Sequence, residues 1–194
     1  MEFLDVIKNR KKISRFTSQP IPDEVLHEIL EAGHLVHSQQ IDQHWYFGVI
    51  KDAELKQKLA DSAGGQDWIA TAPIIIAYCS YLPQDQVSSA HKIRFGKDLC
   101  AYYGEYEEYQ KLDSFWESSN PLIPGEHIVL AAINHGLDAC WVGNLDTLQA
   151  STALNLPYDL KCLFLMPLGY AKDSQDLPKR KSYREIVFYD HWSK

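Results

Sequence analysis

The chain has 194 residues, of which 45% are hydrophobic, 12% aromatic and 23% charged, and its formal net charge is −7. This composition predicts one folded domain over residues 1–194, which buries about 70% of the surface of the unfolded chain, and it excludes a disordered protein. An acidic chain is also a poor candidate for nucleic-acid binding, which needs a basic face.

Neither a membrane span nor a metal site is predicted. The longest apolar run, residues 69–79, is about half as long as a helix that crosses a bilayer. The N-terminus carries Glu2 and Asp5 and then a basic run, unlike a signal peptide, so we expect a cytoplasmic protein. The four cysteines are far apart and show no CxxC spacing, which favours neither zinc nor a disulfide framework.

The positive charges are concentrated near the two ends of the chain. Of the 19 Lys and Arg residues, five lie between Lys8 and Arg15 and four between Lys179 and Arg184. If the fold brings these ends together, they form one anion site; the alternative is two solvated tails.

The first half of the chain predicts a helix, a strand and a second helix. Residues 22–33 begin with Pro and two acids and continue with one apolar stripe, which predicts a helix that ends near Gly33. Residues 45–50 are aromatic and β-branched and predict a strand. Asp52 is then expected to cap a helix that runs to Gly64.

The second half predicts a buried strand and a buried helix, followed by shorter strands. Residues 73–79 are apolar without alternation, which suits a central strand covered on both faces. Residues 126–135 are expected to form a buried helix that ends at Gly136. Further strand candidates are residues 139–142, 163–168 and 186–189. Such an alternation predicts an α/β or α+β protein with a three-layer core.

Five segments, taken in order, resemble the nitroreductase family. They are the basic cluster at residues 10–16 with Pro-Ile-Pro at 20–22; Ser38, Gln43 and Trp45 before the first strand; Gly-Leu-Asp-Ala-Cys-Trp-Val-Gly at 136–143; Leu-Met-Pro-Leu-Gly-Tyr at 165–170; and Lys-Arg-Lys at 179–181. The resemblance implies an α+β fold, a three-layer α/β/α sandwich around a mixed, mainly antiparallel sheet. It also implies an obligate homodimer with two FMN sites at the subunit interface.

The resemblance assigns the two basic ends to the FMN phosphate. Arg10 and Arg180 are the main candidates, because a guanidinium can bind two phosphate oxygens, and Lys11, Lys12 and Lys179 support them. This assignment accounts for the concentration of positive charge near both ends of an acidic chain.

Other positions are assigned to the flavin ring. The resemblance implies that Trp141, Val142 and Gly143 lie against the isoalloxazine, with the Gly143 N–H near its redox-active nitrogen. His37 and Ser38 would come from the partner subunit. For Trp141 the alternative is a core aromatic in a strand.

The chain departs from the family pattern at several places. Lys12 stands where the family has a hydroxyl residue and Ser14 where it has a cation, so contacts to the ribityl chain must be rearranged. In the loop that keeps Ser38 and Gln43, His37, Ile41 and His44 replace Pro, Asn and Pro. The two histidines could act as acids toward a substrate, although a buried, hydrogen-bonded His is more common.

The implied activity is an FMN-dependent transfer of hydride from NADH or NADPH to a small planar acceptor, such as a nitroaromatic or a quinone. Flavin chemistry needs no side-chain nucleophile, and we assign no catalytic side chain. Alternatives are an FMN-binding protein with little turnover, another flavin reaction such as reductive dehalogenation, and an interaction module without flavin.

A polar and aromatic excursion, residues 82–120, separates the two halves of the core. Tyr102, Tyr106 and Tyr109 fall on one helical face there, and we expect this segment to be a lid over the flavin. The alternative is that the tyrosines pack on the core or on the partner subunit.

Overall fold

The computed structural model describes residues 2–37, 45–81, 121–173 and 180–192. The predicted excursion at residues 82–120 lies outside the described residues, and so do Ser38, Gln43 and Lys179.

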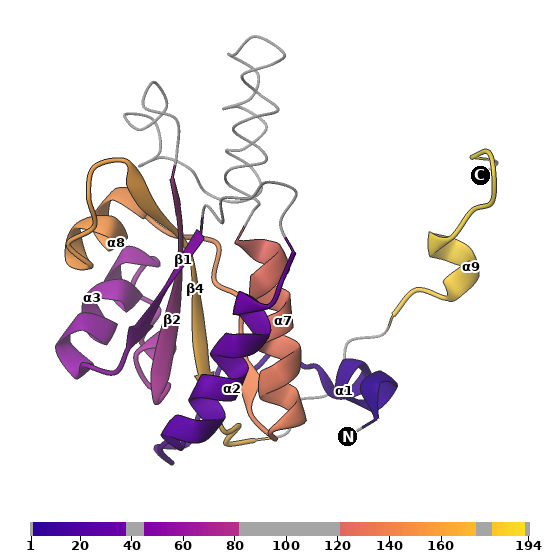
Figure 1. Cartoon of the computed structure of the whole chain (residues 1–194), viewed down its shortest axis with the longest axis horizontal. Helices are drawn as coiled ribbons and strands as arrows, with labels where there is room; N and C mark the ends of the chain where they lie inside the picture. Colours follow the sequence, from indigo (N-terminus) through magenta and orange to yellow (C-terminus); the bar gives the residue numbers. More distant parts are fainter. Residues whose placement is uncertain (1, 38–44, 82–120, 174–179, 193–194) are drawn as a thin grey trace, which may run out of the picture.

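Among the described residues, the strands form a four-stranded sheet (Figure 1). Its strands lie in the order β1 (Trp45–Ile50), β2 (Ile74–Tyr81), β4 (Leu160–Gly169) and β3 (Asp138–Ala139). The ladders that join these strands are antiparallel. The register places Ile76 of β2 between Val49 on one side and Met166 on the other.

Helices cover both faces of the sheet. The helical elements are α1 (Phe3–Asn9), α2 (Asp23–His34), α3 (Ala53–Ser62), the 3-10 turn η1 (Asp67–Ile69), α7 (Leu122–Asn134), α8 (Thr147–Ala153) and α9 (Tyr183–Ile186). Helices α2 and α7 pack together on one face, and α3 and α8 lie on the other (Figure 1). Within the described part of the chain, no helix is long and apolar enough to cross a membrane.

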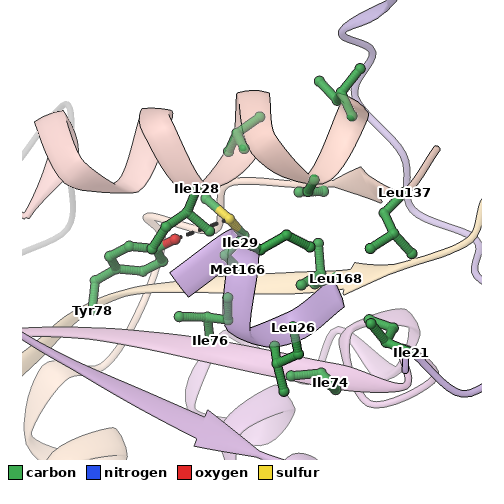
Figure 2. Packing of buried hydrophobic residues seen from close by; sticks show 14 of the residues in the cluster. Ile21, Leu26, Ile29, Ile74, Ile76, Tyr78, Ile128, Leu137, Met166 and Leu168 are labelled. Carbon is green, nitrogen blue, oxygen red and sulfur yellow. Dashed lines mark hydrogen bonds between the residues drawn. The ribbon is translucent and has the colours of Figure 1, made fainter. Parts of the chain in front are cut away.

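The core consists of two hydrophobic layers that β2 and β4 separate. Successive strand residues point to opposite faces, so Ile76 packs toward α2 and α7 (Figure 2), whereas Ile75 packs toward α3. Both residues are fully buried. The prediction of a central strand covered on both faces is therefore confirmed.

Local sequence signals account for several element boundaries. The Asp52 side chain accepts a hydrogen bond from the Leu55 N–H at 2.8 Å and caps α3, as predicted. Strand β1 has the predicted bounds. Helix α8 was not predicted, although Asp146 caps it in the same way, with a hydrogen bond from the Gln149 N–H at 2.9 Å.

Three predicted elements differ from the structure. Helix α7 begins at Leu122 rather than Glu126, since Pro124 falls in the first turn, where a missing N–H breaks no helical hydrogen bond. The strand predicted at 139–142 is shorter, and Val142 forms only an isolated bridge to β4. The strand predicted at 186–189 is wrong, because Ser182 and Glu185 form a capping box that starts α9.

Replacing Ile76 with Ala should lower the free energy of unfolding by about 2–5 kcal/mol, because it leaves a cavity in a fully buried layer. Chemical denaturation measures this change. Ile123, which is 55% exposed on α7, is the matched control, and Ile123→Ala should change stability by less than about 0.5 kcal/mol. Equal losses in the two variants would contradict the assignment of Ile76 to the core.

Candidate functional site

The basic segment at residues 10–16 is fastened to the end of β4. Ile13 and Phe16 are buried and anchor it to the domain. The Thr17 N–H donates to the Tyr170 carbonyl at 2.8 Å. The Lys172 N–H donates to the Arg15 carbonyl at 3.0 Å. The segment therefore has a fixed path past the edge of the sheet.

Residues 138–143 form that edge. The Cys140 N–H donates to the carbonyl of Pro167 at 3.2 Å, and the Val142 N–H donates to the carbonyl of Leu165 at 2.9 Å. Because backbone groups alternate in direction along an extended chain, the N–H groups of residues 141 and 143 point away from β4. In the described part of the chain the Gly143 N–H has no hydrogen-bond acceptor. A donor is thus available at the sheet edge.

Two cations of the basic segment approach this edge. Burial raises the pKa of the Cys140 thiol, and the positive charges of Lys12 and Arg10 oppose that rise. Both cations are thus close enough to Cys140 to act on it electrostatically. The structure brings together these two predicted phosphate ligands and the segment predicted to face the flavin ring.

Lys11 acts on a different carboxyl group. Burial raises the pKa of Asp138, while the Lys11 charge and a hydrogen bond with the Ala171 backbone oppose the rise. Lys11, Ile13 and Asp138 line an open pocket of about 370 Å³. Arg10 and Lys12 do not line this pocket, so Lys11 lies in different surroundings from its two neighbours.

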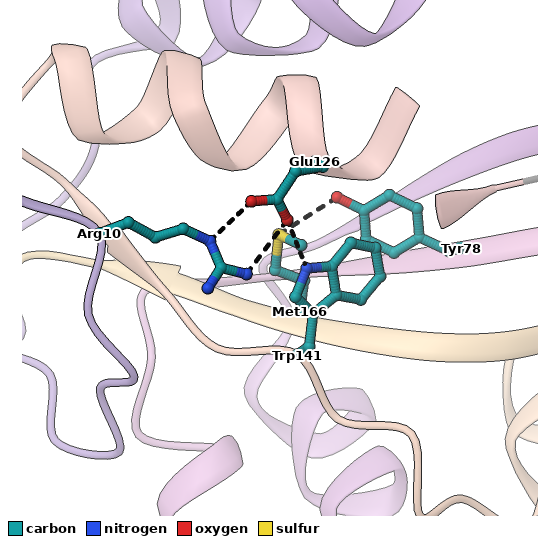
Figure 3. A network of polar contacts seen from close by, with 5 residues as sticks. All are labelled: Arg10, Tyr78, Glu126, Trp141 and Met166. Atoms are coloured by element: carbon teal, nitrogen blue, oxygen red, sulfur yellow. Dashed lines mark hydrogen bonds and ion pairs between the residues drawn. The ribbon is translucent and has the colours of Figure 1, made fainter. Parts of the chain in front are cut away.

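The carboxylate of Glu126, on α7, joins Arg10 to Trp141 (Figure 3). Arg10 Nε lies 2.6 Å from Glu126 Oε1, and the two atoms form an ion pair but not a hydrogen bond. Arg10 Nη2 and Trp141 Nε1 each donate to Glu126 Oε2 at 3.1 Å. The Arg10 and Glu126 side chains are each 39% exposed, so a solute can reach this cluster.

The Trp141 ring packs among other rings. Its centroid lies 4.9 Å from that of Tyr78 and 5.7 Å from that of Phe164. The Tyr78 hydroxyl donates to the sulfur of Met166 at 3.2 Å, and burial, together with the charge of Glu126, raises the pKa of Tyr78 well above its ordinary value. The indole thus contributes to the core, and the contact expected between residues 141–143 and a flavin ring stays a prediction.

The remaining predicted site residues lie elsewhere. Ser14 is half-buried in the basic segment, and His37 is exposed after α2. Arg180 is exposed at the start of the segment that carries α9, which lies apart from the sheet in Figure 1. The joint binding of phosphate by the two ends of the chain stays a prediction.

Sequence reasoning placed Glu126 at a helix start but not in the site. A signal was present, because Glu126 is the one acidic residue in the otherwise mainly apolar sequence of α7. Its partner Arg10 lies 116 positions away, however, and no sequence pattern connects the two.

The fold and site define an α+β domain with an antiparallel sheet, at whose edge a cationic segment lies beside outward-facing backbone donors. Residues 7–170 match the sequence model of the nitroreductase family. The chain therefore belongs to the nitroreductase family.

Several relatives are similar along most of their length. The chain is 25% identical over 186 residues to the NADPH-flavin oxidoreductase of Vibrio harveyi, covering 95% of this chain and 72% of that protein. It is 26% identical over 205 residues to an oxygen-insensitive NADPH nitroreductase of Helicobacter pylori, covering 93% and 97%. The solved structure of the V. harveyi NADPH:FMN oxidoreductase complexed with NAD+ has a TM-score of 0.78 and 22% identity, covering 99% of this chain and 78% of that one, which shows a shared fold.

Replacing Gly125 with Ala should displace the Trp141 ring. A methyl group at this position would collide with the indole and would lie 2.9 Å from Tyr78 Cε1. The expected cost is about 1–3 kcal/mol of stability, despite the better helix propensity of Ala, and tryptophan fluorescence should change with it.

Gly48→Ala is the matched control, because its new methyl group would meet the nearest atom at an ordinary distance of 3.4 Å. Thermal unfolding compares the two variants. A Gly125→Ala protein as stable as the wild type, with unchanged fluorescence, would show that the indole is not packed in this way.

Proposed function

We propose that this chain is an FMN-dependent oxidoreductase that takes hydride from NADH or NADPH and reduces a small planar acceptor, such as a nitroaromatic or a quinone. The observation that carries the proposal is the position of Arg10, which Glu126 joins to Trp141 at the sheet edge of residues 138–143, in a chain of the nitroreductase family. The names of the V. harveyi and H. pylori relatives support a nicotinamide donor, and the former name supports a flavin. Bound FMN would supply the redox chemistry, accepting hydride and passing electrons on.

The donors at this edge suit a flavin phosphate. Arg10 and Lys12 offer charge-assisted hydrogen bonds to an anion, and Lys11 adds positive charge nearby. Lys179 and Arg180 complete the proposed phosphate site from the C-terminal segment. Several cations are needed, because a phosphate monoester carries close to two negative charges.

The same edge suits the polar rim of a flavin ring. The Val142 backbone exchanges two hydrogen bonds with that of Leu165, with N···O distances of 2.9 and 3.1 Å, so the edge is fixed to β4 before a ligand arrives. The Gly143 N–H would then meet an acceptor atom of the ring without a side chain in the way. Ser14 would contact the ribityl chain, and Gln43, outside the described residues, would lie at the ring's border. We assign no catalytic side chain.

The purified protein should be yellow and should be bleached under nitrogen by NADH, NADPH or both. Its absorption spectrum, followed during anaerobic titration with each nicotinamide, tests this expectation. Reoxidation by nitroaromatics and quinones, added one at a time, then measures which acceptors are reduced. A protein that stays colourless with added FMN would refute the proposal, and a yellow protein that neither nicotinamide bleaches would be a flavin-binding protein without this activity.

The proposal includes an obligate homodimer of three-layer α/β/α subunits, with FMN at the interface and His37 and Ser38 reaching the partner's flavin. Exposed apolar side chains support a covered surface. Tyr189 is 76% exposed and Trp192 64% exposed in the C-terminal segment, and Phe3 is 67% exposed on α1. The C-terminal segment and α1 thus each expose large apolar side chains, which a partner subunit would bury.

Light scattering of the FMN-bound protein should give about twice the chain mass of 22.2 kDa. Tyr189→Asp should shift the protein toward monomer and lower its flavin content, because burying the new carboxylate at an interface is costly. Tyr158, 69% exposed between α8 and β4 beside Lys161, is the matched control, and Tyr158→Asp should stay dimeric. A stable, yellow monomer would contradict the dimer proposal.

A further inference from the structure

We infer that Glu126 is a positioning residue that gives the site its preference for a phosphorylated flavin over riboflavin. This inference rests on the proposed FMN site. It adds that Arg10 binds phosphate well only because Glu126 holds its guanidinium in place.

The two carboxylate oxygens of Glu126 contact one side of the Arg10 guanidinium, the side that carries Nε and Nη2. Nε lies 2.6 Å from Oε1, and Nη2 donates to Oε2 at 3.1 Å. A guanidinium carries five N–H groups in one plane, so both N–H groups of Nη1 and one of Nη2 are left over. These form a second fork, suited to two oxygens of a phosphate. Pairing with Glu126 thus leaves Arg10 able to bind an anion.

The carboxylate is itself held on two further sides. The Trp141 indole donates to Oε2 at 3.1 Å, and Trp141 in turn packs against Tyr78 and Phe164. The backbone of Glu126 belongs to α7, which packs on α2. Arg10 is therefore fastened through Glu126 to the rigid part of the domain, although it follows the short helix α1.

Fixing Arg10 in the free protein lowers the cost of binding. An unrestrained Arg side chain loses rotamer freedom when it binds a ligand, and this loss weakens binding. Glu126 moves this loss from the binding step to folding. Positioning therefore predicts that removing Glu126 weakens FMN binding.

Simple electrostatics predicts the opposite sign. Glu126 carries a negative charge beside the proposed phosphate site, and its removal would leave the site more positive. If Glu126 did no more than oppose the phosphate, its loss would tighten FMN binding. The direction of the change therefore decides between the two roles.

The test measures the dissociation constants of FMN and riboflavin for the full chain, by titration of flavin fluorescence. For Glu126→Ala we expect FMN to bind about five- to tenfold more weakly and riboflavin to change less than about twofold, since riboflavin has no phosphate. Arg10→Ala should also lower the preference for FMN, and adding Glu126→Ala to it should lower it no further.

The matched control is Glu28→Ala, which removes an acid that pairs at 2.9 Å with His135, the C-cap residue of α7, at the opposite end of that helix from Glu126. It should leave both dissociation constants unchanged. Should Glu126→Ala fail to fold, Glu126→Gln serves the same purpose, because it keeps the side-chain size but lacks the second acceptor oxygen. It should also lower the preference for FMN.

The outcomes separate this inference from the proposed function. Wild-type protein that binds no FMN would overturn both. Wild-type protein that binds FMN, combined with an unchanged or increased FMN preference in the Glu126 variants, would overturn the positioning role and leave the proposed function intact. An equal loss of FMN and riboflavin affinity would mean that Glu126 is merely structural, and would overturn it as well.

Discussion

The pairing of β2 with β4 is the constraint on which the other elements depend. Both strands are buried on both faces, so helices must cover the sheet on either side. One edge of β2 is paired with β1, and the outer edge of β4 faces β3. Residues 138–142 pair only partly along that edge, through a two-residue strand and a single bridge at Val142. The short pairing exposes outward-facing backbone groups there, and the candidate site lies beside them.

Folding, rather than sequence proximity, gathers the charges of the site. The basic segment meets the end of β4 because Ile13 and Phe16 are buried beneath it and because its backbone is hydrogen-bonded to the residues that follow the strand. Its cations repel one another, and acids from distant parts of the chain offset this repulsion: Glu126 beside Arg10, and Asp138 near Lys11. These carboxylates thus stabilise the cations at the edge of the sheet, and the cations remain there.

The sequence was informative where a signal is local. Strand β1 and the Asp52 cap follow from adjacent residues, and both are confirmed. The prediction of a strand at 186–189 failed, because Ser182 and Glu185 form a capping box that starts helix α9, which runs to Ile186. Glu126 was not assigned to the site because its partners are brought near by tertiary packing alone. Family resemblance located the basic segment and residues 136–143, but not the carboxylate that joins them.

Arginine and lysine have different parts in this arrangement. A guanidinium can bind a carboxylate along one side and still present a second fork, whereas an ammonium is a single point of charge on a flexible stem. Arg10 can therefore be tied to Glu126 and remain a ligand for an anion, while Lys12 contributes charge without a fixed direction. Since the Arg10–Glu126 pair is close to neutral, net positive charge at the edge depends on the lysines. The arginine therefore sets the direction of the hydrogen bonds to an anion, and the neighbouring lysines supply the net positive charge.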